Sequence, residues 1–205
     1  MTDGKPGEQN ALTDEQIADL QTLRVAARQR EWNTLQDTLK RLLTGLDPLI
    51  ALTIPARQAQ KFLPRFEKEY PEALWVRELL LTVIAYASAP KELPQHAINQ
   101  FPSPGCGNFI LAVFDMARAV QEGQKFFERY SHITNATANA VVADLQYFYF
   151  NRHSREYERL HDEETTGEER ADIQQEFWVD RAVSFRDAAT WLEIADDVEA
   201  RLTEN

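Results

Sequence analysis

Apolar side chains recur three or four positions apart along most of this 205-residue chain, which is the spacing of one face of an α-helix. Alanine (25 residues) and leucine (21) far outnumber valine (10) and isoleucine (9), and only 7 glycines are present. This balance favours helices over sheets. We therefore predict an all-α fold, either an irregular multi-helix bundle or a short α-solenoid of antiparallel helical hairpins.

The first two helices are expected to form an antiparallel hairpin. Thr13 and Gln16 have the spacing of a capping box, and Leu12 before them can contact Ile17. The first apolar stripe is Ile17, Leu20, Leu23 and Ala27. The second helix, ended by Gly45, is expected to bury Trp32, Leu35, Leu39, Leu42 and Leu43.

The next segment predicts a helix that stops before Pro71, with Pro64 as a kink or an early break. Its expected buried side is Ala56, Ala59, Phe62, Leu63 and Phe66. Residues 72–89 are hydrophobic on nearly every face, which favours a place at the centre of the core. Regular helical repeats of about 34 residues are excluded, because Pro48 and Pro71 end successive segments at a much shorter interval.

Two long helices are expected after a connector at residues 90–108 that is rich in proline and glycine. One runs from about Asn135 to about Asp162, with Asn135 or Thr137 as its cap and four consecutive aromatic residues at 147–150 that require surrounding contacts. The last runs from about Glu169 to Leu202 and should pair with the preceding helix. Its expected seam is Trp178, Ala182, Phe185, Ala189 and Leu192.

Length and composition predict one helical domain over residues 11–205, with a sub-boundary near 90–108, after a disordered tail at residues 1–10. The single cysteine excludes an intramolecular disulfide, and the N-terminus lacks the features of a signal peptide. No apolar run approaches the roughly 18 residues of a membrane span. We expect a cytoplasmic protein that does not bind membranes.

Negative charge is concentrated near the C-terminus. The net charge is −11, and residues 151–205 hold 16 acidic and 7 basic side chains. Such a field repels phosphates, so we expect no direct binding of nucleic acid, but a basic protein surface would be attracted. The residues expected to meet such a partner are Glu156, Glu158, Asp162, Glu163, Glu164, Glu168 and Glu169.

Two histidines lie among these carboxylates and raise the question of a metal site. Glu158 and His161 form an E-x-x-H unit, but a di-iron bundle needs two such units and the chain has one. We predict no dedicated metal site, with only an adventitious ion at His153, Glu156 or His161 as the alternative. Thr166 and Glu169 instead predict a capping box after an exposed helical corner.

Enzyme signatures are missing from the sequence, and no cofactor is expected. Cys106 precedes a predicted helix whose N-terminus could lower the pKa of the thiol, and His96 could serve as its base. No cysteine-enzyme motif surrounds either residue. We therefore predict no catalytic residue and interpret Cys106 as a turn residue packed against the core.

The leading hypothesis is a non-enzymatic interaction or regulatory protein that binds a protein partner through helical grooves and an acidic C-terminal hairpin. Self-association to a homodimer is left open. The alternative is a small-molecule-binding protein or enzyme with an aromatic pocket between helices, lined by Phe126, Phe127, Tyr130, Tyr147 and Tyr149. A third hypothesis is nucleic-acid mimicry by the carboxylates between residues 156 and 199.

Overall fold

The computed structural model describes residues 11–86, 88–94, 97, 100–152, 154–174 and 185–204. Over these residues the chain forms nine helices and no strand, which confirms the predicted all-α fold. The tail predicted for residues 1–10 lies outside this description. The helices are α1 (Asp14–Gln29), α2 (Trp32–Thr44), α3 (Pro48–Glu69), α4 (Leu74–Tyr86), α5 (Cys106–Ala119), α6 (Phe126–Arg152), α7 (Ser154–His161), α8 (Gly167–Gln174) and α9 (Phe185–Glu204).

Helix α1 begins at the predicted capping box. The Gln16 backbone N–H donates to the Thr13 hydroxyl, and the Thr13 N–H donates to the Gln16 side-chain oxygen. The predicted stripe is wrong at Ile17, which is 41% exposed. Asp19 instead lies toward α2, where it pairs with Arg41 at 2.7 Å, so Ile17 points away from that face.

Helix α2 buries the four predicted leucines and ends at Gly45. Its first residue, Trp32, is partly buried and meets Trp191 of α9 edge to face, with ring centroids 5.8 Å apart. The hydrophobic face of α2 therefore packs against α1, and its N-terminal end reaches α9.

Helix α3 continues through both Pro55 and Pro64, so the predicted early break at Pro64 is wrong. A proline removes one backbone hydrogen bond, and for Pro64 the carbonyl that loses its donor belongs to Gln60. Gln60 and Pro64 are both exposed, so a water molecule can donate a hydrogen bond to the Gln60 carbonyl. The predicted buried side of α3 is confirmed, because Ala56, Ala59, Phe62, Leu63 and Phe66 are all buried.

Helix α4 lies at the edge of the bundle, not at the centre that its composition predicts. It packs against α3 and α5, and it leaves Leu74, Leu81 and Ile84 exposed by 56%, 46% and 37%. Val76, Leu80 and Val83 cover the buried side. The sequence prediction failed because an apolar residue on every face does not show how many faces have neighbours.

Helices α5 and α6 form the centre. Eleven of the fourteen residues of α5 are buried, and α5 packs along α6 more extensively than any other pair of helices does. Gly105 caps α5 with a φ of 81°, and a Cβ at this position would lie 2.1 Å from the carbonyl oxygen of Ala143 on α6. Only glycine permits this backbone approach.

Helix α6 begins at Phe126, so the predicted start near Asn135 is wrong. Asn135 is exposed within the helix, and the hydroxyls of Thr134 and Thr137 donate to the carbonyls of Tyr130 and Ile133. Threonine hydroxyls make such bonds inside helices as well as at caps, which explains the error. Helix α7 ends at His161, which agrees with the predicted end near Asp162, and residue 153 between α6 and α7 lies outside the described residues.

Helix α9 packs mainly against α1 and α3 and contacts α6 less, so the predicted pairing with the preceding long helix is only a minor part of its packing. Its buried residues are Trp191, Ile194, Ala195, Val198 and Leu202. The predicted seam is wrong where it can be checked, because Ala189 is exposed and Leu192 is only half-buried. The side chains of Trp178, Ala182 and Phe185 lie outside the described residues. The seam was predicted one position too late, since Trp191 is buried where Leu192 was expected.

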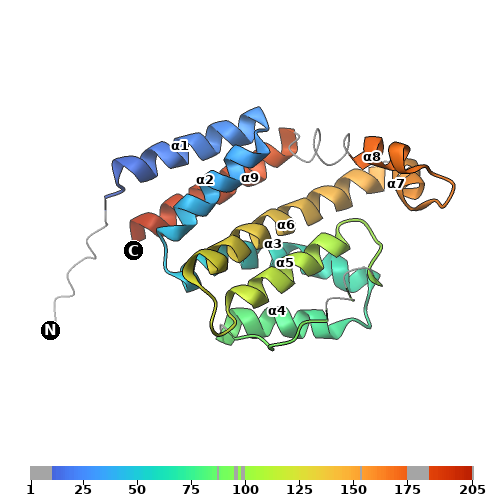
Figure 1. Ribbon diagram of the computed structural model, residues 1–205, viewed down its shortest axis with the longest axis horizontal. Coiled ribbons are helices and arrows are strands. Elements are labelled where there is room, and N and C mark those ends of the chain that lie inside the picture. The colour runs from blue at the N-terminus through green and yellow to red at the C-terminus, as the bar shows by residue number, and fades with distance from the viewer. Residues whose placement is uncertain are drawn as a thin grey trace.

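Figure 1 shows two groups of helices: α1, α2 and α9 lie together, and α3, α4 and α5 lie on the other side of the long helix α6. The buried apolar residues of both groups belong to one hydrophobic cluster, which also includes Ala97 and Phe101 of the connector. The division into domains stays a prediction. None of the helices in the described ranges is long and apolar enough to cross a membrane.

Candidate functional site

The acidic hairpin consists of α7, α8 and the turn between them, residues 154–174. It extends from the C-terminal end of α6, far from α1 and α2 (Figure 1). Helix α7 contacts α6 and α8, and the only extensive contacts of α8 among the described residues are with α7. The hairpin is therefore attached to the bundle mainly through one helix.

Local hydrogen bonds hold the turn of the hairpin. The Thr166 N–H donates to the Glu169 carboxylate at 3.0 Å, and the Glu169 N–H donates to the Thr166 hydroxyl at 3.2 Å, so the predicted capping box is confirmed. The bond from the Thr166 backbone lowers the pKa of Glu169. Arg159 lies 3.3 Å from the same carboxylate, and Arg170 donates to the Asp162 carbonyl.

Most of the predicted partner-binding carboxylates are exposed on this hairpin. The exposed ones are Glu158, Asp162, Glu163, Glu164, Glu168 and Glu169, whereas the side chain of Glu156 lies outside the described residues. Within the described part of the chain only Glu169 of this set has an ion-pair partner. The surface therefore keeps most of its negative charge.

The carboxylates of α9 are different, because basic residues of α1 and α3 already pair with them. Arg24 contacts both Asp196 and Glu199 at 2.6 Å, and these bonds raise the pKa of Arg24. Arg57 lies 3.1 Å from Asp197. The uncompensated negative charge is thus concentrated on the hairpin and does not form one row from residue 156 to residue 199.

An open groove of about 520 Å³ separates the hairpin from the loop before α5. Ser103 fixes the loop side: the Tyr70 hydroxyl donates to the Ser103 Oγ, and the Ser103 N–H donates to the Tyr70 oxygen, both at 2.8 Å. One wall is therefore apolar and the other carries two carboxylates and an imidazole. The groove is lined by Pro102, Ser103, Pro104, Glu158, His161 and Asp162.

Such a groove can hold a lysine or arginine side chain. The aliphatic stem can pack against the two prolines, while the charged head meets Glu158 or Asp162. The two carboxylates were predicted from charge, but Pro102 and Pro104 were not. Their only signal was a rigid proline-rich loop, and nothing in the local spacing places it beside residues 158–162.

The predicted aromatic pocket is not assembled in one place. Phe126 and Phe127 are exposed by 53% and 71% at the start of α6, and Tyr130 is buried with its hydroxyl donating to the Leu46 carbonyl. Tyr147 lies five turns further along α6, about 25 Å from Tyr130, against Phe62 of α3. Tyr149 is half-buried, near Tyr147.

Arg65 covers the aromatic residues at the far end of α6. Its guanidinium lies 5.1 Å from the centre of the Tyr147 ring and 4.5 Å from that of Phe148, and it also pairs with Asp144. The four aromatic residues at 147–150 were expected to be surrounded by other residues. This is only partly so, because Phe148 remains 43% exposed while Phe150 is buried. Cation–π contact replaces helix packing on the exposed side.

Cys106 is the first residue of α5 and is completely buried. Burial raises the pKa of its thiol to about 12, with a smaller contribution from the negative charge of Glu69. This effect is opposite to the activation that a helix N-terminus could give, so the thiol is protonated at neutral pH. His96 and His153 lie outside the described residues.

A buried polar cluster between α5 and α6 was missed by sequence reasoning. Asp115 accepts hydrogen bonds from Arg118 at 2.9 Å and from Asn139 at 3.4 Å, and the His132 Nδ1 lies 3.3 Å from it. Asn108 donates to the Asn139 oxygen at 3.0 Å. These bonds compensate the buried carboxylate and fix the register of the two helices.

No group of three potential metal-binding side chains occurs within the described ranges. Comparison of the chain with models of known protein families, with characterised proteins and with solved structures finds no match.

Proposed function

We propose that this protein is a non-enzymatic interaction protein whose acidic hairpin and adjoining groove bind a basic segment of a partner protein. The observation that supports it most is the groove itself, because Glu158 and Asp162 face a fixed, proline-lined wall. A charged surface alone attracts many molecules. A charged wall opposite an apolar one selects a side chain that has both characters.

Attraction and recognition would come from different residues. Glu163, Glu164 and Glu168 lie outside the lining of the groove and remain without ion-pair partners in the described residues. They supply long-range attraction that accelerates association and weakens as salt screens it. Glu158 and Asp162 make the short-range contacts that hold the bound side chain. Action in the cytoplasm and formation of a homodimer stay predictions.

The test is binding of a short fluorescein-labelled peptide of alternating lysine and serine, followed by fluorescence anisotropy. We expect the double variant Glu158→Gln, Asp162→Asn to weaken binding roughly tenfold at physiological salt, as two partly exposed charge pairs would. A matched control is Glu72→Gln, Glu78→Gln, which changes the net charge equally at exposed positions near α4. This control should change affinity by less than about twofold.

The salt dependence separates steering from groove contacts. Neutralising Glu163, Glu164 and Glu168 should reduce the salt dependence of the association rate and leave the dissociation rate nearly unchanged. Equal weakening by the groove variant and the α4 control would show that only net charge matters, and the proposed site would be abandoned. Absence of peptide binding to the wild-type protein would contradict the proposal directly.

A further inference from the structure

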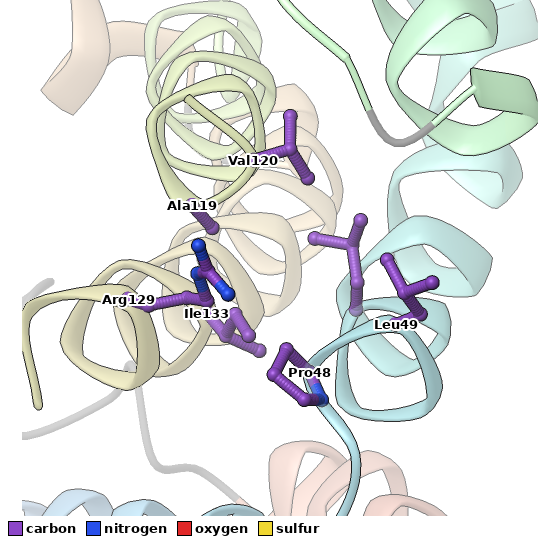
Figure 2. Close-up of a pocket in the computed structure, with 7 residues that line it drawn as sticks. Pro48, Leu49, Ala119, Val120, Arg129 and Ile133 are labelled. Atoms are coloured by element: carbon purple, nitrogen blue, oxygen red, sulfur yellow. The ribbon is translucent and has the colours of Figure 1, made fainter. Parts of the chain in front are cut away.

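A second pocket lies at the opposite end of α6, between the N-terminal end of α3 and the C-terminal end of α5. Its volume is about 90 Å³. Figure 2 shows the side chains of three helices converging on it, with the Arg129 guanidinium between α5 and α6. All other lining residues are apolar: Pro48, Leu49, Leu52, Ala119, Val120 and Ile133.

Arg129 is the polar group of this pocket. Its Nε atom is buried without a hydrogen-bond partner, and within the described part of the chain its guanidinium forms no ion pair. Arg129 as a whole is half-buried, but a buried Nε donor is costly when unpaired, so this position favours an anionic ligand. Arg170 also has a buried Nε without a partner, but its guanidinium donates to the Asp162 carbonyl. Eight other arginines have carboxylate partners: Arg24, Arg41, Arg57, Arg65, Arg77, Arg118, Arg159 and Arg201.

The charges next to the pocket leave the guanidinium available. Asp47, which precedes Pro48, caps α3 by accepting the Leu49 N–H at 2.8 Å. The negative end of the α5 dipole at Ala119 and Val120 opposes an anion, so the attraction depends on the Arg129 guanidinium. A ligand carboxylate could therefore make the two parallel hydrogen bonds for which a guanidinium is suited.

We propose that this pocket binds a small aliphatic carboxylate, with the carboxylate on Arg129 and the alkyl group among Leu52, Val120 and Ile133. The size follows from the volume, because a cavity of roughly 150 Å³ admits benzene and this one is smaller. A branched chain of three or four carbons is appropriate. The site is independent of the hairpin groove, since Arg129 lies about 35 Å along α6 from its C-terminal end.

Isothermal titration with isobutyrate tests the proposal. We expect a Kd of about 1 mM, a value within reach of so small a ligand. The neutral isostere isobutyramide should bind at least about tenfold more weakly, because it cannot form the charge-assisted pair. Arg129→Gln should weaken isobutyrate binding to a similar extent. Lys125→Gln, which removes a highly exposed cation just before α6, should leave the Kd within about twofold.

A second variant keeps the test valid if Arg129→Gln destabilises the protein. Val120→Phe retains the guanidinium but fills the half-exposed mouth of the pocket, and it should abolish isobutyrate binding. The hairpin variant Glu158→Gln, Asp162→Asn should bind isobutyrate as the wild type does, so this site and the groove fail or succeed separately. Equal affinity for isobutyrate and isobutyramide, unchanged binding by Val120→Phe, or no heat of binding to the wild type would overturn the proposal.

Discussion

Two successive regions of the chain are held in place by different forces. Residues 130–143 of α6 are surrounded by α2, α3 and α5, and most of their side chains are buried. Residues 154–174 of the acidic hairpin extend beyond these neighbours and are mostly exposed. The first region is fixed by close packing and buried hydrogen bonds, while the second is fixed by a cap and a few exposed ion pairs.

The difference separates stability from recognition. Substitutions in residues 130–143 or in the residues packed on them should change the free energy of unfolding of the whole protein, because that region contributes to the common core. Substitutions in the hairpin should change binding and local order, with little effect on global stability. Four predictions test this division.

The largest expected effect is that of Gly105→Ala. The added methyl group would lie 2.1 Å from the Ala143 carbonyl oxygen, and the backbone has a φ of 81°, so α5 and α6 must separate. We expect the free energy of unfolding to fall by about 4 kcal/mol, measured by urea denaturation.

Gly123→Ala is the matched control for steric conflict. Gly123 has nearly the same φ of 83°, but nothing lies within 4 Å of the added Cβ. Its expected cost is about 1 kcal/mol, from the backbone conformation alone. Similar losses for the two variants would contradict the close approach of α5 and α6.

The second prediction concerns alkaline pH. Burial raises the pKa of Cys106 from 9.0 to about 12, so the unfolded thiol ionises first and stability falls as pH rises from 9 toward 12. The full loss corresponds to roughly 4 kcal/mol. Cys106→Ala should show a smaller loss over this range, whatever its stability at neutral pH. Parallel pH profiles for the two proteins would show that the thiol is not protected by burial.

The third prediction is a loss of about 1–2 kcal/mol for Tyr130→Phe, which leaves the buried Leu46 carbonyl without its hydroxyl donor. The control is Tyr147→Phe. Tyr147 lies on the same helix, and its hydroxyl donates no hydrogen bond within the described residues. We expect this control to change the free energy of unfolding by less than about 0.5 kcal/mol. Urea denaturation of both variants checks the difference.

The smallest effect is expected for Thr166→Ala in the hairpin. Loss of the cap should accelerate amide hydrogen exchange in α8 about two- to fivefold and leave exchange in α5 unchanged. Exchange that accelerates equally in α8 and α5, or global destabilisation, would contradict local control.

The cap should also depend on pH. Because hydrogen bonds lower the pKa of Glu169, the contribution of this carboxylate to the stability of the cap is present above its ordinary pKa of 4.5 and is lost as pH falls through the lowered value.

Local spacing predicted the parts of the fold that have one buried face. Leu35, Leu39 and Leu43 on α2 are examples, because their face packs against neighbours while the opposite face is solvated. The edge position of α4 could not be predicted, since Leu81 and Val83 have the same apolar character but only one has a neighbour. The number of neighbours around a helix is a property of the tertiary structure.

The candidate site shows the same limit. The charge of Glu158 and Asp162 and the cap at Thr166 could be predicted, because both depend on residues within a few positions of each other. The proline wall of the groove and the isolated guanidinium of Arg129 could not, since each depends on segments distant in sequence. Asp115 was overlooked for the same reason, because its contacts with His132 and Asn139 come from α6.

The pairing of α1 with α9 has a consequence for synthesis of the chain. Arg24 cannot pair with Glu199 until the ribosome has added 175 more residues, and Trp32 likewise cannot contact Trp191 until that residue is made. At 5–20 residues per second the ribosome needs roughly 10–35 s to translate that interval. During this time the faces of α1 and α2 that meet α9 lack their partner helix, so part of the apolar surface of the first hairpin stays exposed to solvent until α9 emerges.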